Sequence, residues 1–178
     1  MEAIISGKRI YLARMGISQV TDKYYSWLNN PEVNQYLESR FVSNSIDQIK
    51  DFVHRAVVSS DIVFAGVFMI DNDNHIGNIK LGNINWIHRT GDIGLLIGEK
   101  EYWGKGYASE AIELITNYAF NELNLHKVWA GCYGCNTGSI KAFKNAGFYE
   151  EARLKEQYFC KGVYMDGIIM ARLKEAEL

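Results

Sequence analysis

The sequence predicts a mixed α/β protein in which an antiparallel meander and strand–helix units share one central sheet. Two observations support this. Segments with alternating polar and apolar residues, typical of strands, occur near both ends and in the middle of the chain, and runs with apolar residues at helical spacing separate them. In chain order the expected elements are β, α, α, β, β, β, α, β, α, β, β. The 178 residues contain one proline and no linker or repeat, so we expect a single domain over residues 1–178.

The first third of the chain predicts one strand and two main helices. Residues 8–15 alternate as a strand does, and Ser18 is the expected N-cap of the helix that follows. This helix should end before Pro31, because the residue ahead of a proline disfavours the helical region. A short helix or turn follows. The next helix begins after Ser45, which forms a capping box with Gln48.

The middle of the chain predicts a meander, and the last third predicts strand–helix units and a hairpin. Strand-like segments separated by turn signals are residues 61–71, 75–89 and 91–98. A helix then runs to about Asn121 or Asn124. It is followed by a strand (126–133), a short helix stopped by Gly147, and a closing hairpin (147–173). The exposed edge strands of this hairpin favour a homodimer.

Composition excludes several classes of function. The net charge is -2 and the basic residues are scattered, which is unlike a nucleic-acid-binding protein. The longest apolar run, residues 62–70, is too short to cross a membrane, and the N-terminus lacks the apolar segment of a secretory signal. We therefore expect a cytoplasmic protein without nucleic-acid or membrane partners. The aromatic share of 13% suits either a core or an aromatic-walled groove.

The three cysteines favour reduced thiols. An odd number cannot form a complete disulfide framework, and Cys160 with His126 does not complete a zinc motif around Cys132 and Cys135. No metal is expected. A redox dithiol formed by Cys132 and Cys135 remains an alternative to two core cysteines at a strand end.

The stretch EYWGKGYASEA, residues 101–111, places small residues at the start of a helix. Gly104, Gly106 and Ala108 allow an anion to approach backbone N–H groups at the positive end of the helix. The spacing excludes the P-loop, because Lys105 is followed by glycine and not by serine or threonine. A dinucleotide fingerprint would need glycine or alanine at the position of Ser109 and an early βαβ unit, and neither is present.

The loop, the strand before it and the segment NTGSIKAFKNAGFYEEARLKEQYFCKGVYMDGIIMARL together resemble the GNAT superfamily of acyl-CoA-dependent N-acetyltransferases. The likeness is strongest to the branch with the RimJ/RimL-type enzymes, and it extends from end to end of the chain. It implies a mostly antiparallel sheet of six to seven strands, flanked by helices, with a V-shaped splay between the fourth and fifth strands. It also implies acetyl-CoA as co-substrate.

The resemblance implies a set of coenzyme-binding residues. The family loop has the form R/Q-x-x-G-x-G/A and binds the pyrophosphate of coenzyme A, and in this chain a tryptophan takes the Arg/Gln place. The splayed strand pairs with the pantetheine arm, and its backbone N–H groups would hold the oxyanion of the reaction. The residues implied are Leu95, Leu96, Ile97, Trp103, Gly104, Lys105, Gly106, Tyr107, Ala108, Asn136 and Ser139.

The resemblance also directs the choice of catalytic residues. Many family members protonate the leaving thiolate with a tyrosine, but Phe143 occupies that place here, so Ser139 becomes the expected acid. For the base we consider Asp92, Glu101 and Glu156, and favour Glu156 on the closing hairpin.

The acceptor is expected on the side opposite the coenzyme, between residues 26–40 and the closing hairpin. Glu38 and Arg40 would set its charge preference. The sequence leaves open a protein N-terminus, a polyamine and an amino sugar. A non-catalytic acyl-CoA-binding module also remains an alternative, because Phe143 lacks a hydroxyl. The side chains expected to wall the acceptor pocket are Trp27, Tyr36, Trp86 and Tyr158.

Overall fold

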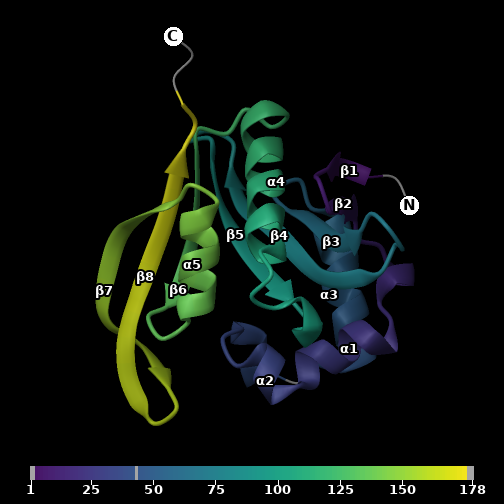
Figure 1. The fold of residues 1–178 in the computed structure, drawn as a ribbon, viewed down its shortest axis with the longest axis horizontal. Helices are drawn as coiled ribbons and strands as arrows, with labels where there is room; N and C mark the ends of the chain where they lie inside the picture. The colour runs from purple at the N-terminus through teal and green to yellow at the C-terminus, as the bar shows by residue number, and fades with distance from the viewer. Residues whose placement is uncertain (1–2, 43, 176–178) are drawn as a thin grey trace.

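Eight strands form one open sheet in the computed structural model, which describes residues 3–42 and 44–175 (Figure 1). The spatial order is β1-β2-β3-β4-β5-β6-β8-β7. The strands are β1 (Ala3–Ser6), β2 (Ile10–Arg14), β3 (Val63–Met69), β4 (His75–Asn85), β5 (Thr90–Ile97), β6 (Lys127–Tyr133), β7 (Tyr149–Cys160) and β8 (Val163–Leu173). The helices are α1 (Asp22–Asn29), α2 (Pro31–Asn34), α3 (Ile46–Val58), α4 (Tyr107–Asn121) and α5 (Thr137–Asn145).

The mixed α/β fold and the meander are confirmed, but the strand count is not. Strands β3, β4 and β5 follow one another as antiparallel neighbours. The sheet has eight strands and not six to seven, because the four-residue β1 pairs with β2. A strand this short carries too little alternation to be recognised from the sequence. The predicted splay therefore lies between the fifth and sixth strands.

Helix ends follow local capping chemistry. The first helix begins three residues later than expected, because Thr21 and not Ser18 accepts the hydrogen bond from the N–H of Tyr24. It ends before Pro31, which takes the first position of α2, where a missing N–H has no cost. The capping box of Ser45 and Gln48 is present at the start of α3.

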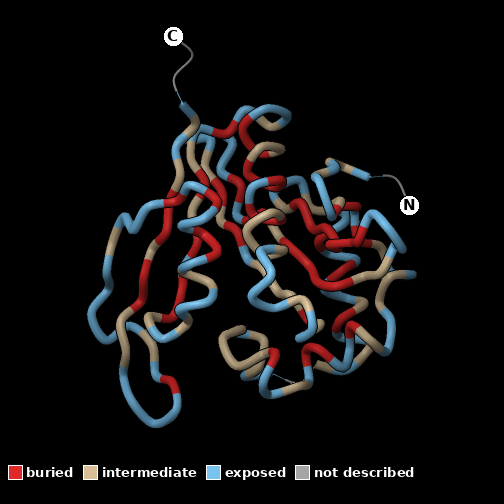
Figure 2. The backbone as a smooth tube through the Cα atoms, in the orientation of Figure 1, coloured by how far each residue is buried: buried red, intermediate tan, exposed pale blue. Residues whose placement is uncertain are grey.

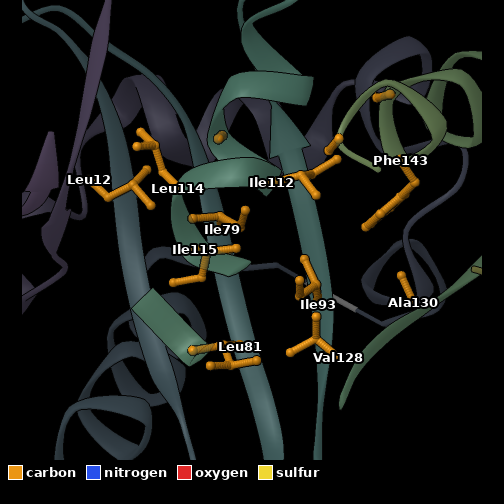
Figure 3. Packing of buried hydrophobic residues seen from close by; sticks show 14 of the residues in the cluster. Leu12, Ile79, Leu81, Ile93, Ile112, Leu114, Ile115, Val128, Ala130 and Phe143 are labelled. Atoms are coloured by element: carbon orange, nitrogen blue, oxygen red, sulfur yellow. The ribbon is translucent and has the colours of Figure 1, made fainter. Parts of the chain in front are cut away.

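The helices cover the two faces of the sheet and bury two cores. Helices α4 and α5 pack on one face, where Ile112 and Ile115 of α4 point toward Ile79 and Ile93 of the strands (Figure 3). The other face carries α1, α2 and α3, which bury a second cluster that includes Trp27. In Figure 2 the buried segments run through the middle of the sheet, and the outer strand of the closing hairpin is mostly exposed.

The splay between β5 and β6 is the feature of the fold that creates a site. The two strands are parallel and joined through α4, and they pair only from Thr90–Asp92 to Lys127–Trp129. Beyond these residues β5 continues with β4 as its only partner, and β6 continues along β8. The sheet therefore opens into a gap at the carboxyl ends of β5 and β6, where ligands commonly bind in α/β proteins.

The described part of the chain contains no helix that is long and apolar enough to span a lipid bilayer.

Candidate functional site

A cavity of about 480 Å³ occupies the gap between β5 and β6. Its walls come from the second half of β5, the loop that leads into α4, the end of β6, the first turns of α5, and the segment from α2 to residue 38. Its volume is within the range of small-molecule sites, which is about 300 to 1,000 Å³. The cavity therefore joins the splay, the glycine loop and the expected acceptor side in one continuous space.

The free edge of β5 presents peptide groups to this cavity. The N–H of Gly98 donates to the carbonyl of Ile76 in β4 at 2.9 Å. Because peptide groups alternate in direction along an antiparallel strand, those of Leu95 and Ile97 face away from β4 and into the gap. Leu95, Leu96 and Ile97 all line the cavity. The strand edge can thus pair with an extended ligand that carries amide groups.

The glycine loop presents a second set of donors. Gly104 and Gly106 have φ values of 70° and 86°, which L-amino acids with a side chain rarely adopt. Gly106 is the N-cap of α4, and its carbonyl accepts the first hydrogen bond of the helix from Glu110. Within the described residues, the N–H groups of Tyr107, Ala108 and Ser109 have no protein acceptor. They lie at the positive end of a 15-residue helix, an arrangement that suits an anion.

The loop is held from behind by the turn between β1 and β2. The guanidinium of Arg9 donates to the carbonyl of Lys105 at 2.9 Å and to the carboxylate of Glu110 at 2.8 Å. The same carboxylate accepts the backbone N–H groups of Lys8 and Arg9. Burial raises the pKa of Glu110, but the hydrogen bonds and the charge of Arg9 outweigh it and lower the pKa below 4.5. Glu110 is therefore ionised at neutral pH and compensated by Arg9.

The start of α5 brings a hydroxyl to the cavity. The side chain of Asn136 caps the helix by accepting the N–H of Ser139 at 3.1 Å, and both residues line the cavity. The hydroxyl of Ser139 lies 3.5 Å from the sulfur of Cys132, whose pKa burial raises. Phe143 lines the cavity one helical turn further on and packs edge-to-face against Phe148. Its ring supplies no proton donor.

A cluster of aromatic and charged side chains closes the opposite end of the cavity. The hydroxyl of Tyr133, at the end of β6, donates to the carboxylate of Glu38 and accepts from Arg40 at 2.8 Å. Burial, and then the bond to Glu38, raises the pKa of Tyr133, so its hydroxyl keeps its proton at neutral pH. Tyr36 lies against Tyr133 with ring centroids 5.9 Å apart, and Tyr158 stacks on its ring at 4.2 Å.

The structure brings most of the predicted site residues to the cavity, but not all of them. Lys105 does not line it, since its carbonyl is held by Arg9. Tyr158 lies behind Tyr133 and does not line it directly. The predicted residues that do line it are Tyr36, Leu95, Leu96, Ile97, Trp103, Gly104, Gly106, Tyr107, Ala108, Asn136 and Ser139.

Three predicted residues lie elsewhere. Trp27 is 3% exposed in the core under α1, where its indole donates to Glu99. Trp86 lies in the turn between β4 and β5 and bonds to the carbonyl of Ser60, away from the splay. Glu156 has an exposed side chain and a φ of 51°. It lies in a bulge of β7, where the pairing register with β8 shifts between Leu154 and Tyr158.

The other carboxylates considered as bases also lie outside the cavity. Asp92 accepts from Asn83 and pairs with Lys80. Glu101 is exposed in a short 3-10 helix, Lys100–Tyr102, before the loop. Among the carboxylates of the described residues, only Glu32 and Glu38 line the cavity. Glu32 pairs with Lys100, so Glu38 is the carboxylate linked to the inner cluster.

The three cysteines lie in different surroundings. Cys132 is buried beside Ser139, Cys135 is exposed, and both are free thiols, as is Cys160. Over residues 3–42 and 44–175, no group of three or more His, Cys, Asp or Glu side chains is arranged to hold a metal ion.

The sequence analysis missed contacts between residues that are far apart in the chain. Arg9 is more than ninety positions from the loop that it holds, and Tyr133 meets Glu38 from another part of the chain. A signal was present for Glu110, because an acidic residue in the first turn of a helix commonly finds donors there. The partner of that residue could not be read from spacing.

Comparison with known proteins places these features in a family context. Residues 9–149 match the family model described as an acetyltransferase (GNAT) domain. This span includes β5, the glycine loop, β6 and α5.

Individual relatives are similar over part or most of the chain. A probable N-acetyltransferase of Bacillus subtilis is 35% identical over 109 residues, which are 61% of this chain and 60% of that protein. A spermidine N(1)-acetyltransferase of Vibrio cholerae is 37% identical over 93 residues, 52% of this chain and 53% of that protein. The chain thus spans little more than half the length of these curated relatives. A crystal structure of spermidine N-acetyltransferase from Vibrio cholerae, in complex with CoA and spermine, aligns with a TM-score of 0.81 at 26% identity and covers 92% of this chain and 95% of that one.

Proposed function

The chain belongs to the GNAT acetyltransferase family, and we propose that it transfers an acetyl group from acetyl-CoA to a primary amine in a ternary complex. The observation that carries the proposal is the continuity of one cavity. The cavity runs from the anion-binding loop, along the free edge of β5, to the cluster around Tyr133. A pyrophosphate, an amide-bearing arm and a reacting amine would meet these three regions in that order.

The residues along the cavity fit coenzyme A. The free N–H groups at the start of α4 suit a pyrophosphate. The N–H and carbonyl of Leu95 and the N–H of Ile97 suit the amides of the pantetheine arm. The amide of Asn136 lies at the cavity wall on the opposite side. The pyrophosphate and the pantetheine arm therefore each have polar partners along the cavity.

The chemistry is a direct acyl transfer. The nitrogen of a neutral amine attacks the thioester carbonyl carbon, the C–N bond forms and the C–S bond breaks. The nitrogen loses one proton and the leaving sulfur gains one, so the products are an N-acetylamine and free coenzyme A. A backbone N–H of β5, at Leu95 or Ile97, would hold the negative charge that develops on the carbonyl oxygen. Such a fixed donor is worth about 10² to 10³ in rate.

Ser139 is the proposed acid for the leaving thiolate. Its hydroxyl lines the cavity on the wall formed by α5, where Phe143 has no proton donor. Thiolates are tolerable leaving groups, so a modest acid suffices. A positioned proton donor typically contributes about 10² to 10⁴ in rate.

We assign the base to Glu38 in place of Glu156. An amine with a pKa of about 8 to 10 is mostly charged at neutral pH and must lose a proton before it attacks. Glu38 lines the cavity, and its bond to Tyr133 orients the carboxylate at the acceptor end. The proton would pass to this carboxylate directly or through one water molecule.

The acceptor is a small primary amine in this proposal, and a polyamine is the favoured example. Two observations support it. The cavity wall at that end is aromatic and carboxylate-bearing, and the similar sequences and structures include spermidine N-acetyltransferase of Vibrio cholerae. Aromatic faces and carboxylates both attract alkylammonium groups. An amino sugar or a protein N-terminus, the latter typical of the RimJ/RimL-like branch, would contradict the polyamine assignment but not the reaction.

The experiment that tests the proposal is an acceptor screen with acetyl-CoA. Spermidine, spermine, amino sugars and peptides with free N-termini are compared by release of the coenzyme thiol. Turnover with any amine supports the reaction, and the ranking of kcat/KM identifies the class of acceptor. If coenzyme A binds but no amine is acetylated, the chain is an acyl-CoA-binding module and the enzymatic proposal is wrong.

A further inference from the structure

The turn between β1 and β2 encloses one carboxylate of α4. Glu110 accepts the backbone N–H groups of Lys8 at 2.9 Å and Arg9 at 2.8 Å, and its second oxygen accepts the Arg9 guanidinium at 2.8 Å. Gly7 allows this close approach, because a methyl group there would lie 2.8 Å from the carboxylate oxygen. The side chain of Glu110 is 14% exposed. A short hairpin at one edge of the sheet is thereby fixed to the first turn of α4.

Arg9 extends this contact into the glycine loop. Its guanidinium donates to the carbonyl of Lys105 at 2.9 Å and lies over the ring of Tyr107, 4.3 Å from the centroid. A methyl group on Gly106 would lie 3.4 Å from a guanidinium nitrogen. One side chain therefore touches the three consecutive residues, 105 to 107, at which the loop becomes a helix.

The loop needs such an anchor. Gly104 and Gly106 both have positive φ, and glycine has more conformational freedom to lose than any other residue. The carbonyl of Lys105 and the N–H of Gly106 share the peptide plane that leads into Gly106, the N-cap of α4. By fixing the carbonyl of Lys105, Arg9 fixes this plane, just ahead of the free N–H groups of residues 107–109.

Arg9 also decides the charge at this site. Glu110 is a negative charge in the first turn of the helix that is to bind a pyrophosphate, and without compensation it would repel that anion. The ion pair with Arg9 offsets this negative charge, and the guanidinium also lies beside Gly106.

We propose that Arg9 is a positioning residue for the pyrophosphate of coenzyme A, acting from outside the loop through Lys105, Gly106 and Glu110. This inference rests on the proposed function. It assigns to Arg9 the positive charge that the family loop places at the position of Trp103. Arg9 lies outside the cavity wall, so it acts on the coenzyme through the loop and through its charge.

The test separates the pyrophosphate from the rest of the co-substrate. The binding of coenzyme A to the wild-type protein and to Arg9→Met is measured by calorimetry, and turnover is measured with acetyl-CoA and with S-acetylpantetheine, which lacks the pyrophosphate. We expect Arg9→Met to raise the Kd of coenzyme A and the KM of acetyl-CoA by about tenfold or more, as for loss of a charge-assisted hydrogen bond. The kcat/KM of S-acetylpantetheine should stay within about twofold.

The matched control is Arg14→Met. Arg14 lies in the same hairpin and also contacts α4, through the hydroxyl of Tyr118 at 3.4 Å, but far from the loop. Arg14→Met should leave unchanged the Kd of coenzyme A, the KM of acetyl-CoA and the kcat/KM of S-acetylpantetheine. Arg9→Lys keeps the positive charge but cannot contact Lys105 and Glu110 together as the guanidinium does. It should therefore recover part of the affinity for coenzyme A that Arg9→Met loses. Arg9→Lys also provides the test if the methionine variant does not fold.

The outcomes are distinguishable. Unchanged affinity of Arg9→Met for coenzyme A overturns the inference, and so does an equal loss of turnover with both thioesters, because that indicates general damage to the fold. A lysine variant that binds no better than the methionine variant contradicts the role of charge. If the wild-type protein itself does not bind coenzyme A, the proposed function fails and not the placement of Arg9.

Discussion

The indole N–H of Trp103 donates a hydrogen bond of 2.7 Å to the carbonyl of Ile97. This bond ties the glycine loop to the end of the splayed strand. The carbonyl of Ile97 faces the gap between β5 and β6, so Trp103 takes up a strand acceptor that would otherwise be open to the ligand. The tryptophan at the place of the family's Arg or Gln thus fixes the distance between the glycine loop and β5, the two walls of the proposed coenzyme site.

Trp103→Phe tests this relationship. It keeps an aromatic ring and removes the indole N–H, so the loop loses its bond to Ile97. Because Trp103 is 42% exposed, water replaces part of the lost bond, and we expect a rise of about threefold to tenfold in the KM of acetyl-CoA. The kcat should change less than the KM. A KM equal to that of the wild-type protein would show that the bond does not position the loop.

Gly106 and Gly104 offer a matched pair of substitutions in the loop. Both have positive φ, so Ala at either position should cost about 1 to 2 kcal/mol of stability. Gly106→Asp adds bulk beside Arg9 and a negative charge at the N-terminus of α4. We therefore expect coenzyme A binding to fall below detection by calorimetry.

Gly104→Ala is the control, because nothing lies within 4 Å of the added methyl group. It should lower the melting temperature while the protein retains measurable affinity for coenzyme A. Equal affinities in Gly106→Asp and the wild-type protein would refute the location of the anion site.

Much of the fold was predictable because its signals are local. The capping box at Ser45, the break at Pro31 and the glycine that stops α5 depend on neighbouring residues alone. The same holds for the glycine loop. The short β1 was missed because four residues carry almost no periodicity. Ser18 and Thr21, three positions apart, are both candidate caps for the first helix, and Thr21 is the one used.

The acceptor end was harder to predict because its contacts join distant segments. Trp27 and Trp86 were expected at the cavity for their size, but one is buried under α1 and the other lies in a turn. An aromatic residue suits a core and a pocket equally well, so composition cannot separate the two. Tyr133 and Glu38 meet across 95 positions in the sequence, which no spacing rule predicts.

Ser139→Ala tests the proposed acid. The variant keeps the cavity shape and removes the hydroxyl beside Cys132, so kcat should fall by about 10² while the KM of acetyl-CoA changes little. The double variant Ser139→Ala with Phe143→Tyr places a phenol on the same wall and should recover part of the loss, since Phe143 lines the cavity one turn away. A kcat unchanged in Ser139→Ala would mean that the thiolate leaves without help from this residue.

His75 predicts a dependence of stability on pH. It lies among Trp27, Tyr24 and Phe68, and burial lowers its pKa below the usual 6.5. The unfolded chain therefore binds a proton below pH 6.5 that the folded protein does not bind, and stability falls by up to about 1.4 kcal/mol per pH unit until the folded pKa is reached. Urea unfolding at pH 7.5, 6.5 and 5.5 should show this slope in the wild-type protein and not in His75→Gln. Equal pH dependence of the free energy of unfolding in the two proteins would contradict the role of His75.

Glu38→Gln tests the acceptor end, and Glu32→Gln is its matched control. Both carboxylates line the cavity, but only Glu38 accepts the hydroxyl of Tyr133, whereas Glu32 pairs with Lys100. If Glu38 takes the proton of the amine, Glu38→Gln should lower kcat by about 10² for every amine, and the loss should shrink as the pH rises and more amine is neutral. The Kd of coenzyme A should not change. A loss confined to acceptors with a second positive charge, and seen in KM, would instead make Glu38 a binding residue. Equal effects of the two substitutions would refute a specific role for the Glu38–Tyr133 pair.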